Sequence, residues 1–123
     1  MAKLNYVTVG SNDLEKAKAF YDGLLGSIGM KPLYEHPSGG RLYRGDGFMF
    51  GVLGPFDGNP ACVGNGMMGG FALDTVEEVD AFHAKALELG GKDDGAPGER
   101  MPKVYFAYFR DLDGNKLCAY KMG

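Results

Sequence analysis

The sequence predicts an α+β fold built from two tandem βαβββ units, and three observations carry this prediction. A strand-like segment precedes an amphipathic helical segment twice, over residues 4–25 and again over residues 68–89. Short extended segments separated by Gly, Pro and Asp follow each helical segment. Moving the chain by 62 positions places Glu15 on Glu77 and Phe20 on Phe82, which indicates an internal repeat.

The first predicted unit occupies about residues 3–54. Its first strand covers residues 4–10, and a helix runs from about Asp13 to Leu25 and ends near Gly26. Asn12 and Glu15 have the spacing of a capping box, with Asn in place of the usual Ser or Thr. Three strands then follow at about residues 31–36, 41–44 and 47–53.

The second unit occupies about residues 66–122, after a Gly- and Pro-rich connector at 55–65, and the two units together form one domain of 123 residues. Its first strand covers residues 68–73, and Thr75 with Glu78 forms a capping box for a helix that stops at Gly90. Residues 92–98 predict a weak strand and a loop. The last two strands are expected at residues 104–110 and 116–121.

Each unit should place its helix on one face of its sheet. The alternation of side chains assigns Val7 and Phe71 to the helix-facing side. The other side carries Tyr6 and Thr8 in the first unit, and Met68 and Gly70 in the second. Because that second side is moderately apolar, we expect it to curl into a cleft, within one chain or across a dimer.

Composition excludes several classes of partner. The net charge is −3 and no cluster of Lys and Arg occurs, so a nucleic-acid partner is not expected. No apolar run of about 20 residues is present, so no membrane span is expected. Cys62 and Cys118 lack a CxxC spacing and no signal peptide is recognisable, which favours free thiols in the cytoplasm.

The order of several short motifs resembles the vicinal oxygen chelate superfamily, the group of lactoylglutathione lyases, bleomycin-resistance proteins and extradiol dioxygenases. The resemblance covers nearly the whole chain. It implies the paired βαβββ fold, commonly as a homodimer, with a ligand or metal held in the curved sheet. The segments that carry it are residues 6–10, 13–16, 19–21, 24–26, 79–82, 90–91, 95–98 and 109–115.

Enzymes of that superfamily hold a divalent metal with two His and one Glu, and the resemblance places these ligands at Tyr6, Met68 and Cys118. All three positions depart from the pattern. A phenol and a thioether are poor ligands for a hard cation, and a single thiolate is not a site. We therefore expect no bound metal and no other cofactor.

The remaining candidates are ligand-binding groups. Arg100 follows a Gly- and Pro-containing loop that borders the pocket in the family, and it could hold an anionic group. Neither His36 nor His83 has a carboxylate at a diagnostic spacing, so both are expected to be ordinary surface or half-buried residues. The predicted ligand-binding set is Tyr6, Thr8, Phe50, Met68, Gly70, Arg100, Tyr105, Cys118 and Tyr120.

Three functions remain open at this point. The first is a metal-independent protein that binds a small, partly apolar molecule. The second is a lyase, isomerase or dioxygenase-type enzyme with an unconventional or absent metal site, in which Tyr6 or Cys118 acts as acid or base. The third is a dimeric regulatory or assembly module whose pocket is filled by its own side chains.

Overall fold

The computed structural model describes residues 1–123 and divides the chain into two compact units, Met1–Val63 and Gly64–Gly123. The division falls inside the connector predicted at residues 55–65. Each unit contains one helix and one four-stranded mixed sheet, which confirms the predicted α+β fold of two βαβββ units.

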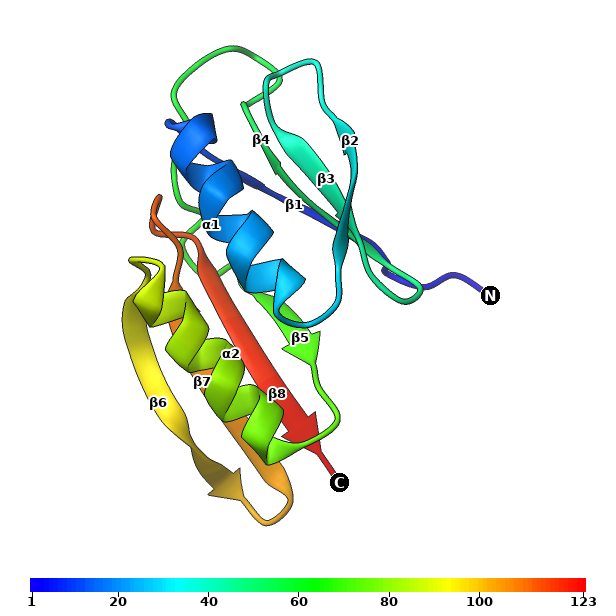
Figure 1. Cartoon of the computed structure of the whole chain (residues 1–123), viewed down its shortest axis with the longest axis vertical. Coiled ribbons are helices and arrows are strands. Elements are labelled where there is room, and N and C mark those ends of the chain that lie inside the picture. Colours follow the sequence, from blue (N-terminus) through cyan, green and yellow to red (C-terminus); the bar gives the residue numbers. More distant parts are fainter. The chain divides into compact units, whose positions relative to one another are not determined.

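The first unit is a sheet of strand order β1-β4-β3-β2 (Figure 1). Strand β1 is parallel to β4, and the other neighbours are antiparallel. The helix α1 joins β1 to β2 and lies on one face of the sheet. The elements are β1 (Tyr6–Gly10), α1 (Leu14–Gly26), β2 (Lys31–Glu35), β3 (Arg41–Arg44) and β4 (Met49–Leu53).

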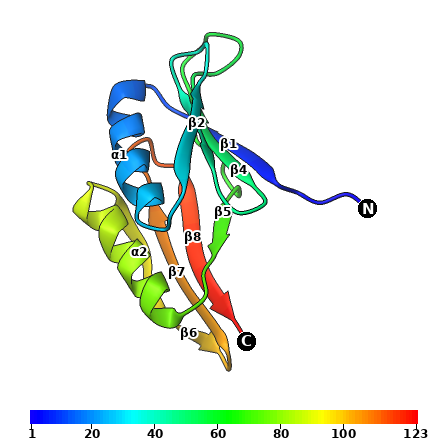
Figure 2. The ribbon, with the colours of Figure 1, turned by 45° about the vertical axis from the view of Figure 1, so that its right-hand side comes forward.

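The second unit repeats this topology with the order β5-β8-β7-β6. Strand β5 is parallel to β8, and the helix α2 packs across β7, β6 and β8, as the turned view in Figure 2 shows. The identical strand order confirms the repeat inferred from the sequence. The elements are β5 (Gly69–Ala72), α2 (Val76–Glu88), β6 (Lys92–Met101), β7 (Val104–Arg110) and β8 (Lys116–Met122).

Aromatic side chains form the core between helix and sheet in each unit. In the first unit the ring centre of Tyr21 on α1 lies 5.1 Å from that of Phe50 on β4. In the second unit Phe82 on α2 lies 5.4 Å from Phe71 and 5.8 Å from Phe109. These rings are all buried, so their removal from water supplies much of each unit's stability.

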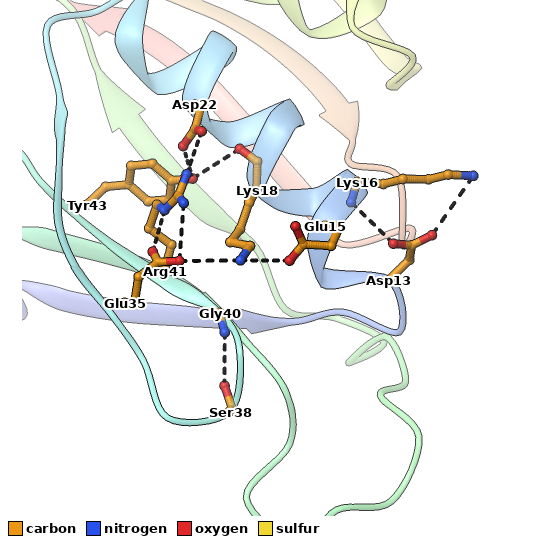
Figure 3. Close-up of polar contacts among 10 residues, drawn as sticks. All are labelled: Asp13, Glu15, Lys16, Lys18, Asp22, Glu35, Ser38, Gly40, Arg41 and Tyr43. Atoms are coloured by element: carbon orange, nitrogen blue, oxygen red, sulfur yellow. Dashed lines mark hydrogen bonds and ion pairs between the residues drawn. The ribbon is translucent and has the colours of Figure 1, made fainter.

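A network of ion pairs also fixes α1 to its sheet (Figure 3). Arg41 on β3 contacts Asp22 on α1 and Glu35 on β2, and the Tyr43 hydroxyl donates a 2.7 Å hydrogen bond to Asp22. Lys18 on α1 lies 3.3 Å from Glu35. Burial and the Asp22 contact both raise the pKa of Tyr43, so its hydroxyl stays a donor.

Two local predictions need correction. The N-cap of α1 is Asp13, whose side chain accepts a hydrogen bond from the Lys16 amide, and not Asn12. The Asn12 side chain instead exchanges hydrogen bonds of 2.9 and 2.7 Å with the backbone of Ala61. The predicted weak strand and loop at 92–98 belong to the ten-residue strand β6, whose pairing with β7 is interrupted by three register shifts.

Candidate functional site

The face of the second sheet opposite α2, here called the helix-free face of that unit, carries a row of three aromatic rings. Phe106 lies 4.9 Å from Tyr120 and 5.8 Å from Tyr108 between ring centres, with interplanar angles of 10° and 18°. Phe106 is paired with Tyr120 across β7 and β8, and Tyr108 is two residues further along β7. All three rings are half-buried, so this aromatic row is partly accessible.

Glycines on the neighbouring strands make room for the aromatic row. A Cβ atom on Gly95 would lie 2.8 Å from the Tyr108 ring, and one on Gly70 would lie 3.3 Å from the Tyr120 ring. Gly70 and its neighbour on the same face, Ala72, are both exposed. At these positions the neighbouring strands therefore contribute almost no side-chain bulk, which is the close-approach role of glycine.

Arg100 lies at the Tyr108 end of the row. Its Cζ atom is 5.6 Å from the centre of the Tyr108 ring. Its Nη1 atom donates to the carbonyl of Gly98 at 2.9 Å, and its Nη2 atom donates to the carbonyl of Ala96 at 2.8 Å. These contacts hold the guanidinium group against the ring, and no carboxylate pairs with it.

Lys116 provides a second positive charge beside the same ring. Its Nζ atom lies 5.1 Å from the centre of the Tyr108 ring and 3.3 Å from Asp94. Asp94 also accepts a 3.0 Å hydrogen bond from Arg110. Lys116 and Arg110 thus share the carboxylate of Asp94, whereas Arg100 forms no ion pair within the protein.

The thiol of Cys118 lies in this face but is only 1% exposed. Burial raises its pKa to about 11, an effect that the nearby Lys116 only partly offsets. The thiol is therefore protonated near neutral pH. This protonation state disfavours Cys118 as a nucleophile or a base.

In the first unit the helix-free face is less aromatic. Tyr6 is 45% exposed. Thr8 pairs with Gly51, and the Leu42 side chain packs so closely on Gly51 that a Cβ atom at position 51 would collide with it. Met68 is exposed and directly precedes β5 in the second unit. Within their own units, Tyr6 and Thr8 share one face, as do Gly70, Cys118 and Tyr120.

Two residues of the predicted set lie on the helix-covered faces instead. Phe50 is buried against Tyr21 of α1. Tyr105 donates a 2.6 Å hydrogen bond to Asp80 of α2. Neither shares a face with the other predicted residues of its unit. Phe50 pairs with Val7, the neighbour of Tyr6, and Tyr105 pairs with Lys121, the neighbour of Tyr120, and side chains of successive residues point to opposite faces. We therefore leave both out of the candidate site, and include Phe106, Tyr108 and Lys116.

His83 also differs from its expected environment. It is buried on α2, and its Nε2 atom lies 2.9 Å from Asp93 on β6. Its partner is ten residues away, a separation that no local motif reveals. The pair lies on the helix-covered side beside Phe109, where it joins α2 to the sheet.

The positions that correspond to the family's metal ligands do not fit a divalent cation. Tyr6 offers a phenol, Met68 a thioether, and Cys118 a buried thiol whose pKa is raised. Hard divalent cations prefer carboxylate and imidazole ligands. Nowhere in the chain do three or more His, Cys, Asp or Glu side chains gather in a way that could hold a metal ion.

A separate depression lies among the loops of the first unit. Its polar side chains are engaged in hydrogen bonds to those loops, as Ser38 is with the Gly54 amide at 3.0 Å. We therefore assign it a structural role. It is lined by Ser11, Asn12, Ser38, Gly54, Pro55, Gly58, Asn59 and Pro60.

Comparison with known proteins gives the family. Residues 3–119 match the model of the Glyoxalase/Bleomycin resistance protein/Dioxygenase superfamily, so the chain belongs to this superfamily. Among curated proteins, none matches the sequence. Both helices are too short and too polar to serve as membrane-spanning segments.

Solved structures support the same assignment. A glyoxalase/bleomycin resistance protein from Albidiferax ferrireducens T118 is 46% identical, with a TM-score of 0.88 and coverage of 95% of this chain and 96% of that one. A lactoylglutathione lyase from Agrobacterium tumefaciens shares the fold at 19% identity, with a TM-score of 0.73 and coverage of 98% and 93%. An enzyme of the superfamily from Burkholderia phytofirmans PsJN, 21% identical, has a TM-score of 0.76 and coverage of 97% and 98%.

Proposed function

We propose that this chain is a metal-independent protein that binds a small, partly apolar molecule on the helix-free face of its second unit. The aromatic row of Phe106, Tyr108 and Tyr120 is the observation that carries the proposal. Half-buried rings with little side-chain bulk beside them provide apolar surface for a flat ligand. The unsuitable donors at the family's metal positions support the metal-independent form of the proposal.

An enzyme is the alternative within the same superfamily. It would need an acid, a base or a nucleophile on the helix-free faces. The protonated thiol of Cys118 is poorly suited to the last two roles. The burial of Cys118 therefore favours binding over catalysis by this thiol.

The assembly that we propose follows from family membership, and the location follows from the free thiols of Cys62 and Cys118, which are typical of a reducing compartment. We propose a homodimer in the cytoplasm. Exposed apolar side chains just before β1 and just before β5 support self-association, among them Leu4 at 90% and Met67 at 71% exposure. Size-exclusion chromatography with light scattering distinguishes a dimer from a monomer of 13.2 kDa.

Two measurements test the binding proposal. Native mass spectrometry of the purified protein with Zn, Ni, Mn or Fe should show no stoichiometric metal, and a metal bound at one equivalent contradicts metal independence. A thermal-shift screen of flat aromatic compounds should give hits that Phe106→Ala loses. The matched control is Phe56→Ala, because Phe56 is a fully exposed ring of the first unit and its removal should leave the hits unchanged.

A further inference from the structure

The proposed binding face also indicates the class of its ligand. From Tyr120 through Phe106 and Tyr108 to Arg100, each group is within 4.9 to 5.8 Å of the next. The first three groups are aromatic, and the last is a guanidinium. We propose that the face binds planar aromatic carboxylates, with the apolar part along the aromatic row and the carboxylate at Arg100. This inference rests on the proposed function.

Arg100 is prepared for an anion by its surroundings. Two of its five N–H donors bind the carbonyls of Ala96 and Gly98, and three remain without a protein partner. The two bonds and the Tyr108 ring restrict the orientation of the guanidinium. Because this restriction precedes binding, a ligand carboxylate loses less of its interaction energy in ordering the side chain.

The charges near the row favour a singly charged anion. Of the two cations that lie against the Tyr108 ring, Lys116 already pairs with Asp94, and only Arg100 lacks a carboxylate. One planar guanidinium matches the two oxygens of a carboxylate. Asp94 would repel a doubly charged phosphate more strongly than a singly charged carboxylate.

The test compares two probes of nearly identical shape, 2-naphthoate and the neutral 2-naphthamide. The protein has no Trp, so naphthalene fluorescence reports binding without a tryptophan background. We expect the carboxylate to bind about three- to tenfold more tightly than the amide. Added salt should reduce this preference, because Arg100 is exposed.

Arg100→Gln should abolish the preference, because it should weaken binding of the carboxylate far more than binding of the amide. The matched control is Lys121→Gln, which removes one positive charge from the same unit on the helix-covered face of β8. The control should keep the preference. Equal binding of the two probes to the unchanged protein, or a preference that survives in Arg100→Gln, overturns the carboxylate assignment.

A third variant separates this inference from the proposed function. Phe106→Ala should weaken both probes equally, since it removes the centre of the aromatic row. If both probes weaken while no preference exists, the binding face stands and the carboxylate assignment fails. If neither probe binds, or if Phe106→Ala changes nothing, the proposed face itself is contradicted.

Discussion

The Arg100 guanidinium occupies the space that a side chain at position 98 would need, because a Cβ atom on Gly98 would lie 2.9 Å from Nη1 of Arg100. Gly98 does not have a positive φ, so alanine is compatible with its backbone. Gly98→Ala should therefore displace the flexible end of Arg100 and change the free energy of unfolding by less than about 1 kcal/mol. We expect Gly98→Ala to reduce the preference for 2-naphthoate over 2-naphthamide, in the same direction as the loss expected for Arg100→Gln.

Urea denaturation and probe titration on the same preparation check this prediction. A Gly98→Ala protein of normal stability that keeps the full preference would show that the position of the guanidinium does not matter. Gly95→Ala is a useful contrast, because its φ of 152° and its contact with the Tyr108 ring should make this variant less stable.

The Tyr43 hydroxyl provides a test of the network that joins α1 to its sheet. Tyr43 is 1% exposed and donates a 2.7 Å hydrogen bond to Asp22. Tyr43→Phe keeps the ring and removes this bond, so the free energy of unfolding should fall by about 1 kcal/mol. Urea denaturation measures the change. Tyr34→Phe, at an exposed position on β2, should change stability by less than about 0.5 kcal/mol, and an equal loss in both variants would contradict this role of Tyr43.

The fold could be predicted from the sequence because its signals are local and repeated. The alternation in β1 and β5 correctly placed Val7 and Phe71 on the helix side, where they pair with Phe50 and Ala119. Thr75 is also confirmed as the N-cap of α2, since its hydroxyl accepts a 3.1 Å hydrogen bond from the Glu78 amide. Each of these features depends on residues within a few positions of one another.

The aromatic row was harder to predict because β7 carries rings on both faces. Tyr105 and Phe109 face α2, whereas Phe106 and Tyr108 face away. Only the pairing of β7 with β8 decides which rings meet Tyr120. The five-residue connection between Arg110 and Lys116 sets the register of β7 and β8. Because these two residues pair, Phe106 lies opposite Tyr120.

Strand β6 was predicted only in part, as a weak strand and a loop at residues 92–98, for a different reason. Its Gly and Pro residues predict a loop, and the structure accommodates them as bulges beside β7. Those bulges bring the carbonyls of Ala96 and Gly98 to Arg100. The irregular backbone that obscured the strand therefore also supplies the two carbonyls that orient the guanidinium.

The pair of His83 and Asp93 predicts how stability depends on pH. The Gly95 amide and the His83 ring hold the pKa of Asp93 below its ordinary value of about 4. A lowered folded-state pKa contributes stability above the unfolded-state pKa, and this contribution is lost as pH falls through the folded-state value. Asp93→Asn should therefore be less stable than the unchanged protein at pH 7.

Chemical denaturation between about pH 7 and pH 2 tests this expectation, because the two stability curves should converge in acid. Asp46→Asn is the control, since Asp46 is an exposed turn residue that forms no ion pair. A constant difference between Asp93→Asn and the unchanged protein at every pH would mean that the carboxylate charge contributes nothing.

The two cysteines should differ sharply in reactivity. Cys62 is exposed, whereas Cys118 is buried and its pKa is raised to about 11. The thiolate is the reactive species, so at about pH 8 Cys118 should react with a disulfide reagent on the order of a hundredfold more slowly than an ordinary thiol. The time course should show one fast thiol in the folded protein and two in urea. Cys62→Ser should remove the fast phase, and a fast phase that persists in this variant would show that Cys118 is accessible and ionised, which would reopen a catalytic role for it.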